Sequence, residues 1–287
     1  IHLPTKLADI EVRQEDLPTI IKQALMVEDI SCVPYTVTAE MLMGAIESWK
    51  HTPGPEMGAT YIKEGVCMMT EAELFEKMKR ELYTGLVCDV MDSLGYRNQA
   101  MHCRIRPLEP DNCKIAGRAK TILAVDVYEV EENPYEMEIK SIDSIKPGEV
   151  PVVCTNNSPN NGVWGGLLST ATKMRGGTGA IIDGFTRDTD EIRALDFPVF
   201  CAGYMPLDSN GRGKVIAMDC AVVVGGIRVR PGDVVFADFD GVVIIPAEIF
   251  DRVVELSFEK REKESHTKRE LLEGKLLAEV YAKYGVL

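Results

Sequence analysis

The chain has 287 residues, of which 45% are hydrophobic and 27% charged, a composition typical of a globular protein that buries a sizeable core. Its net charge of −13 repels phosphate backbones and anionic lipid, and the densest basic stretch, 258–269, alternates with acidic residues. No run approaches the roughly 18 apolar residues of a transmembrane helix, so we expect neither nucleic acid nor a membrane as a partner.

Residues 1–70 are predicted to form a helical N-terminal arm. Apolar residues recur at helical spacing over 15–28 and again over 38–49, and a turn rich in proline and glycine follows at 51–55. We interpret this arm as a packing or oligomerisation element rather than a catalytic one.

An α/β pattern begins near residue 70. Thr70 and Glu73 have the spacing of a capping box, and Gly95 is placed to end the second helix. Helical and strand-like patterns then follow in chain order: helices at 70–82 and 86–94, strands at 115–130 and 150–155, a helix at 165–174, a strand at 179–183, a helix at 188–195 and a strand at 199–201.

The remainder of the chain is predicted to be a run of short strands and then a helical tail. Tight glycine and proline turns separate the strands, which we place at 215–218, 220–224, 227–229, 234–237 and 241–245. A charged amphipathic helical region extends from about 248 to 281 and is interrupted near Gly274. Residues 71–287 are therefore predicted to form one mixed α/β domain that includes these C-terminal helices.

The candidate chemistry begins where the apolar strand Ala180-Ile181-Ile182 runs into Asp183-Gly184-Phe185-Thr186-Arg187-Asp188. Ligand groups collect at the C-terminal ends of strands in α/β folds. Arg187 suits a carboxylate or a developing enolate, and Asp188 is a hard oxygen ligand for Mg²⁺ or Mn²⁺. Glu191, three residues on, shares a helix face with Asp188. Taken alone, an Arg-Asp pair is more often a helix cap with exposed acids.

A glycine-rich turn precedes these residues. Gly165 and Gly166 open a predicted helix, so the backbone N–H groups of Leu167 and Leu168 are available to a small carboxylate that Arg187 would face. Taken alone, the glycines more often serve close packing of a helix on a strand. Trp164 beside them either lines the pocket or belongs to the core.

Together these residues resemble the RraA-like family. Gly166, twenty intervening residues, Arg187-Asp188 and Glu191 are similar to that family's G-x20-R-D-x2-E/D pattern. The family includes class II pyruvate aldolases that act on 4-hydroxy-4-methyl-2-oxoglutarate. The resemblance covers roughly 72–287 and continues through Gly203-x-x-Pro206, Pro231-Gly232-Asp233, Ala237-Asp238, Asp240-Gly241-Val242-Val243 and Leu277–Leu287.

The resemblance implies a swivelling β/β/α-type fold that assembles as homotrimers or homohexamers, with active sites between subunits. It implies that the Leu167 and Leu168 N–H groups hold the pyruvyl carboxylate and that Arg187 binds the keto or enolate oxygen. Asp188 would anchor Mg²⁺ or Mn²⁺, partly through water, and Glu191 would hold water on that metal. An acid from a neighbouring subunit would complete the site, for which Glu262 and Glu264 are candidates.

One position departs from part of the family. Some members carry an aspartate where this chain has Gly166, which adds a carboxylate near the metal. The glycine places this chain in the other branch and leaves its metal affinity and substrate choice open.

The sequence therefore predicts a divalent-metal-dependent lyase that cleaves a 2-oxo acid through an enolate and releases pyruvate. The reaction would be retro-aldol cleavage of a 4-hydroxy-2-oxo dicarboxylate or decarboxylation of oxaloacetate. Two alternatives remain: a related lyase or hydrolase acting on another small carboxylate, and a non-catalytic regulator of ribonuclease E. Turnover discriminates the enzyme from the regulator.

Cysteine and histidine usage favours a reducing compartment without zinc. The eight cysteines are scattered without a CxxC pair, and the four histidines share no ligand spacing. The first residues show no basic stretch followed by an apolar one, so no secretory signal is visible. We expect buried free thiols and a cytoplasmic location.

Overall fold

The computed structural model describes residues 69–286. The helices predicted at 15–28 and 38–49 lie outside the described residues, and the domain boundary near residue 70 stays a prediction. Within the described part, none of the helices combines the length and the unbroken apolar character needed to cross a bilayer.

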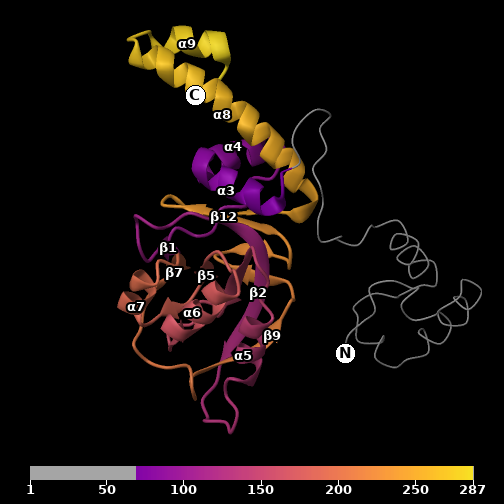
Figure 1. The fold of residues 1–287 in the computed structure, drawn as a ribbon, viewed down its shortest axis with the longest axis vertical. Helices are drawn as coiled ribbons and strands as arrows, with labels where there is room; N and C mark the ends of the chain where they lie inside the picture. Colours follow the sequence, from indigo (N-terminus) through magenta and orange to yellow (C-terminus); the bar gives the residue numbers. More distant parts are fainter. Residues whose placement is uncertain (1–68, 287) are drawn as a thin grey trace, which may run out of the picture. The chain divides into compact units, whose positions relative to one another are not determined.

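The fold is organised on an eight-stranded sheet that is parallel at its centre (Figure 1). The parallel strands are β2, β3, β5 and β7, flanked by antiparallel β1 on one side and by β12 and β13 on the other; β9 also pairs with β2. The bounds are β1 Arg106–Pro107, β2 Ile115–Asp126, β3 Glu149–Cys154, β5 Ala180–Ile182, β7 Val199–Cys201, β9 Gly213–Met218, β12 Val234–Asp238 and β13 Gly241–Ile245.

The parallel strands β5 and β7 are apolar at every position because they are buried on both faces. In β5, Ile181 packs into one core cluster while Ala180 and Ile182 pack into the other. In β7, Phe200 joins the first cluster and Val199 the second. The helices that connect the parallel strands contribute to the second cluster, and the hairpin of β10 (Val222–Val224) and β11 (Ile227–Val229) contributes to the first.

Three helices connect the parallel strands: α5 (Glu136–Asp143), α6 (Gly166–Met174) and α7 (Thr189–Ala194). The others are α3 (Glu71–Glu81), α4 (Thr84–Ser93), α8 (Phe250–Leu272) and α9 (Leu277–Tyr284), with a short 3-10 turn, η4 (Ala247–Ile249), before α8. Figure 1 shows α8 leading away from the sheet beside α3 and α4. Gly274, at φ +87°, ends α8 at the predicted interruption.

Most predicted elements are confirmed, with three kinds of correction. The strand predicted over 115–130 ends at Asp126, where its pairing with Gly213 of β9 ends. The thiols are only partly buried as predicted: Cys113, Cys154 and Cys201 are buried, whereas Cys103 is exposed. Several short elements were not predicted: α5, β1, β4 (Gly162–Trp164), β6 (Phe185–Thr186) and β8 (Gly203–Tyr204).

Candidate functional site

The site is built on a small sheet of three parallel strands, β4, β6 and β8. Each follows a strand of the central sheet, so three consecutive strand ends meet in one place. The N–H of Arg187 donates to the carbonyl of Trp164 at 2.9 Å, and the N–H of Met205 donates to the carbonyl of Thr186 at 2.9 Å. These bonds hold the glycine turn and Arg187, far apart in sequence, side by side.

Gly162 allows this small sheet to pack closely, so Gly162→Ala is expected to destabilise the protein. A Cβ at this position would stand 2.5 Å from the carbonyl oxygen of Met205, which is backbone and has little freedom to move. We expect a loss of about 1–3 kcal/mol in the free energy of unfolding, measured by urea denaturation. Gly85→Ala is the control, since its Cβ would meet only the Tyr83 ring at 3.6 Å. Equal effects of both changes would contradict this explanation.

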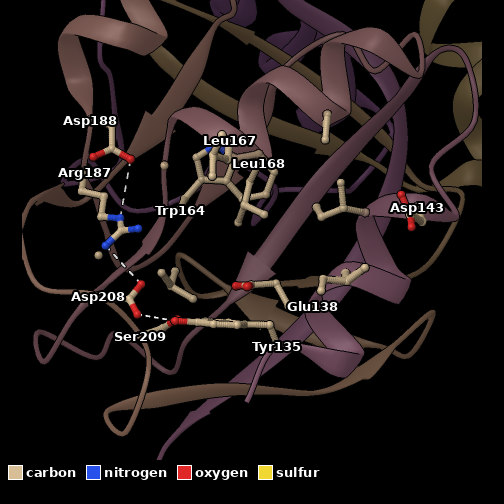
Figure 2. Close-up of a pocket in the computed structure, with 16 residues that line it drawn as sticks. Tyr135, Glu138, Asp143, Trp164, Leu167, Leu168, Arg187, Asp188, Asp208 and Ser209 are labelled. Atoms are coloured by element: carbon tan, nitrogen blue, oxygen red, sulfur yellow. Dashed lines mark hydrogen bonds and ion pairs between the residues drawn. The ribbon is translucent and has the colours of Figure 1, made fainter. Parts of the chain in front are cut away.

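A cavity of about 420 Å³ opens beside this sheet, between α5 and α6. Figure 2 shows the side chains that line it. Apolar groups from both helices and from β4 form part of the wall, and charged groups converge at the strand ends. The lining residues are Tyr135, Glu138, Ile139, Ile142, Asp143, Gly162, Val163, Trp164, Gly165, Leu167, Leu168, Ala171, Arg187, Asp188, Asp208 and Ser209.

Arg187 lies between two carboxylates at one end of the cavity (Figure 2). Its Nη1 is 3.1 Å from Oδ1 of Asp208, and its Nε is 3.5 Å from Oδ2 of Asp188. The side chains of all three are about one third exposed. A guanidinium held on two sides is fixed in orientation while the rest of its edge faces the cavity, which suits a substrate oxygen.

Asp188 occupies the position before helix α7 but does not cap it. Its backbone has φ +56°, in the left-handed region, and its side chain makes no capping hydrogen bond to α7. Oδ2 instead accepts a hydrogen bond of 3.1 Å from the N–H of Gly166. Aspartate adopts this backbone region more readily than most residues, and here it directs the side chain away from α7. The helix-cap interpretation of the Arg-Asp pair is therefore wrong for the Asp188 side chain.

The two glycines bring the helix onto the acidic residues. A Cβ on Gly165 would stand 2.6 Å from Oδ2 of Asp188, and one on Gly166 would stand 2.4 Å from Oε2 of Glu191. The glycines of this turn therefore also allow the start of α6 to pack closely against Asp188 and Glu191. Glu191 fills the space that a side chain at residue 166 would take, so its carboxylate lies against the glycine turn.

These contacts bring the Asp188 and Glu191 carboxylates against the same glycine turn. Within residues 69–286, no group of three or more histidine, cysteine or acidic side chains converges in the manner of a closed metal site. Mg²⁺ is commonly held by one or two carboxylates while water or substrate completes its coordination, and the hard oxygen donors suit Mg²⁺ or Mn²⁺. The residues present therefore fit such an ion in an open site.

The N-terminus of α6 offers a second binding element. Ser169 is the first residue whose N–H bonds within the helix, to the carbonyl of Gly165 at 3.0 Å, and Gly166 donates to Asp188. The N–H groups of Leu167 and Leu168 lie between these two donors, at the positive end of the helix. Trp164 supports this end: it is buried, lines the cavity, and its Nε1 donates to Oγ of Ser169 at 2.8 Å.

Five polar residues of the cavity lining were not predicted from the sequence: Tyr135, Glu138, Asp143, Asp208 and Ser209. The Tyr135 hydroxyl donates to Oδ2 of Asp208, and this hydrogen bond raises the pKa of Tyr135 to about 12. Burial alone would raise the pKa of Asp208, but hydrogen bonds from Tyr135 and the Asn210 N–H, together with the Arg187 charge, hold it below its usual range. Asp208 is therefore ionised beside Arg187.

The pKa of Glu138 is shifted in the opposite direction to that of Asp208. Burial raises its pKa to about 7, the negative charge of Asp208 adds to the effect, and Arg187 opposes it. A carboxyl whose folded pKa exceeds its unfolded value keeps its proton in the folded state while the unfolded chain loses it. Folding stability therefore falls as the pH rises from the unfolded pKa to about 7.

Glu138→Gln is expected to remove this pH-dependent loss. We compare the free energy of unfolding of the variant with that of the wild type at two pH values. At pH ~4 the Glu138 carboxyl is largely protonated in both the folded and the unfolded chain, so the difference there is the reference. Above pH ~7 the difference should shift in favour of the variant by about 1–3 kcal/mol. Urea denaturation at both pH values measures the change. Glu136→Gln, an exposed neighbour on α5, is the control and should show no such dependence. A stability difference for Glu138→Gln that is the same at both pH values would contradict the assignment.

The structure brings most predicted site residues together. The cavity is lined by Gly165, Leu167, Leu168, Arg187 and Asp188. Gly166 and Glu191 are not part of the lining, but they pack against each other next to Asp188. The predicted partner-subunit acids are elsewhere, on α8, and do not line the cavity of their own chain. The Glu264 carboxylate accepts a hydrogen bond from the Tyr83 hydroxyl, whereas Glu262 is exposed.

Comparison with known proteins identifies relatives of this architecture. A sequence model of the RraA-like family, described as Aldolase/RraA, matches residues 84–244. Protein DlpA of Legionella pneumophila is 28% identical over 198 residues, which are 69% of this chain but only 32% of DlpA. A Halalkalibacterium halodurans protein, provisionally named a 4-hydroxy-4-methyl-2-oxoglutarate aldolase, is 26% identical over 214 residues, or 74% of this chain and 96% of that protein.

A solved structure supports the same relationship. Streptomyces coelicolor RraAS2, described as an unusual member of the RNase ES inhibitor RraA protein family, matches with a TM-score of 0.62 at 27% identity, covering 70% of this chain and 98% of that one. The predicted RraA-like α/β fold with C-terminal helices is thereby confirmed. The family match spans 161 residues (84 to 244) and includes the glycine turn, Arg187 and Asp188. The chain belongs to the RraA-like family.

Proposed function

We propose that this protein is a divalent-metal-dependent carbon–carbon lyase that cleaves a 2-oxo acid through an enolate and releases pyruvate. The observation that carries the proposal is the grouping of Arg187, Asp188 and the α6 N-terminus at one end of a single cavity, with the Glu191 carboxylate against Gly166 of the same turn but outside the cavity lining. The match to a family described as Aldolase/RraA, and relatives named as aldolases, support the same reaction class.

Each group of residues has a separate role in binding and cleaving the substrate. The N–H groups of Leu167 and Leu168 bind the carboxylate, and Arg187 binds the keto oxygen and stabilises its charge as the enolate develops. Asp188 and Glu191 hold Mg²⁺ or Mn²⁺, which when bound supplies further positive charge for the enolate. In retro-aldol cleavage the C3–C4 bond breaks, the C4 hydroxyl loses its proton to give a carbonyl product, and C3 gains a proton to give pyruvate.

We also propose that the working form is a homotrimer or homohexamer with its sites between subunits. The cavity of one chain contains acids beside Arg187 but no exposed acid from the C-terminal helices. Glu262 is the better candidate for a partner-subunit acid, since Glu264 already binds Tyr83 within its own chain. The free thiols among the described residues agree with a cytoplasmic location.

The proposal can be tested without knowing the natural substrate. An enzyme that stabilises the pyruvate enolate should exchange the methyl protons of pyruvate with deuterium from solvent when Mg²⁺ or Mn²⁺ is present. The loss of the methyl signal is followed by proton NMR in D₂O. We expect exchange with the wild type and none above background after EDTA. Absence of exchange at any metal concentration would reject the enolate mechanism.

The likeness to RraAS2 supports a second candidate, a non-catalytic regulator that binds a ribonuclease. This alternative predicts a stable protein–protein complex and no turnover, and it requires neither the metal-binding carboxylates nor a lined cavity. Deuterium exchange into pyruvate therefore separates the two functions.

A further inference from the structure

The cavity wall formed by Tyr135, Glu138 and Asp208 carries chemistry that the proposed reaction centre does not use. Figure 2 shows Tyr135 and Glu138 across the cavity from Leu167 and Leu168, with Asp208 next to Arg187. A 2-oxo acid whose carboxylate lies at the helix N-terminus would extend its distal carbons toward this wall. We call these three residues the distal wall.

The charges around the cavity do not match a second substrate carboxylate. Among the described residues that line it, four are acidic, Glu138, Asp143, Asp188 and Asp208, and only Arg187 is basic. Arg187 is already flanked by Asp188 and Asp208, at 3.5 and 3.1 Å. A second carboxylate would lose its hydration without gaining a free cationic partner, and it would face the ionised Asp208.

The same wall suits neutral hydroxyl groups. The Glu138 carboxyl can accept a hydrogen bond from a substrate hydroxyl. Oδ2 of Asp208 already accepts from Tyr135 and from the Asn210 N–H, so Oδ1, which pairs with Arg187, is the oxygen that would accept another, and bonds from a hydroxyl to an ionised carboxylate are strong. A cationic tail fits less well, because the Asp208 charge is balanced by Arg187 and burial keeps Glu138 largely protonated below pH ~7.

We propose that the distal wall selects 2-oxo acids whose distal carbons carry hydroxyl groups and rejects those that carry a second carboxylate. The substrate class is then a hydroxylated 4-hydroxy-2-oxo monocarboxylate, cleaved to pyruvate and a hydroxyaldehyde. This inference rests on the proposed lyase function. It differs from the dicarboxylate substrates that the family resemblance implies, 4-hydroxy-4-methyl-2-oxoglutarate and oxaloacetate.

The test compares two substrates that differ only at the distal carbon. Pyruvate release is measured with 4,5-dihydroxy-2-oxopentanoate and with 4-hydroxy-2-oxoglutarate, in Mg²⁺, for the wild type and two variants. The wild type should prefer the dihydroxy acid by at least about tenfold in kcat/KM. Glu138→Lys adds a cation to the wall and should shift the ratio toward the dicarboxylate by at least about tenfold.

Glu136→Lys is the matched control, because it makes the same charge change on α5 at an exposed residue outside the cavity lining. It should leave the substrate ratio unchanged. Asp208→Asn provides a second variant, which keeps one oxygen to accept from either Arg187 or Tyr135, removes the ionised group and should also shift the ratio toward the dicarboxylate.

The outcomes separate the two proposals. A wild type that cleaves the dicarboxylate as well as or better than the dihydroxy acid overturns the specificity inference and leaves the lyase function standing. Equal shifts from Glu138→Lys and Glu136→Lys overturn it as well. Deuterium exchange into pyruvate without cleavage of either substrate rejects this substrate class, whereas no exchange rejects the lyase function itself.

Discussion

Replacing Arg187 by lysine is expected to lower kcat by about 10²–10³-fold, the typical effect of losing a group that stabilises developing oxyanion charge. Lysine keeps the positive charge but lacks the planar fork that contacts Asp188 and Asp208 through different nitrogens. It cannot hold both carboxylates and present a donor to the substrate in one geometry. The variant is assayed by pyruvate release and by deuterium exchange into pyruvate.

Arg193→Lys is the matched control for this change. Arg193 lies on α7, six positions after Arg187, and pairs with Glu109 at 3.4 Å outside the cavity lining. Its replacement should leave kcat within about twofold of the wild type, since exposed ion pairs contribute little. A full wild-type rate for Arg187→Lys would show that the guanidinium geometry is not needed.

Asp188→Asn is expected to weaken metal binding and to lower metal-dependent activity by more than about 100-fold, beyond the upper end of the effect of losing a residue that only supports a ligand. Asparagine tolerates the left-handed backbone at φ +56° and keeps an oxygen that accepts from the Gly166 N–H. The fold should therefore survive while the charged metal ligand is lost. Calorimetric titration with Mn²⁺ measures binding directly, and thermal unfolding checks the fold.

Asp190→Asn serves as the control, because Asp190 is an almost fully exposed acid on the same helix and pairs only weakly with Arg193. Mn²⁺ affinity should be unchanged in this variant. If Asp188→Asn bound Mn²⁺ as tightly as the wild type, the metal site would have to be placed elsewhere.

The candidate site residues that are close together in sequence were predictable, because they lie in two short continuous segments. Arg187 and Asp188 lie shortly after the apolar strand β5 and directly after β6, and Gly165 and Gly166 stand at the start of helix α6. The spacing between the two segments indicated that they act together. The structure adds the physical reason: β4 and β6 are neighbouring strands, and the Arg187 N–H bonds the Trp164 carbonyl.

The opposite side of the cavity could not be predicted in the same way. Tyr135, Glu138 and Asp208 reach it only because α5 and the loop after β8 fold back over the strand ends. Strands of two or three residues, as in β6 and β8, are too short to show an alternating pattern. The distal wall is therefore a product of tertiary structure.

The geometry of Asp188 was also beyond a sequence pattern. An acidic residue before a helix is usually interpreted as a helix cap. The left-handed backbone of Asp188 and the hydrogen bond that it accepts from the Gly166 N–H show instead that its carboxylate points toward Gly165 and Gly166. Glu191 was predicted to share this side of the helix. The Glu191 carboxylate takes the space that a side chain at residue 166 would need, which explains why a glycine stands there.

The most direct test of the central claim is pyruvate release from 4-hydroxy-2-oxo acids by the full chain, with and without divalent metal. We predict turnover with Mg²⁺ or Mn²⁺, its loss after EDTA, its return when metal is restored, and its near absence in Asp188→Asn. The same rate before and after EDTA, or full activity in Asp188→Asn, would contradict a metal-dependent lyase centred on Arg187 and Asp188.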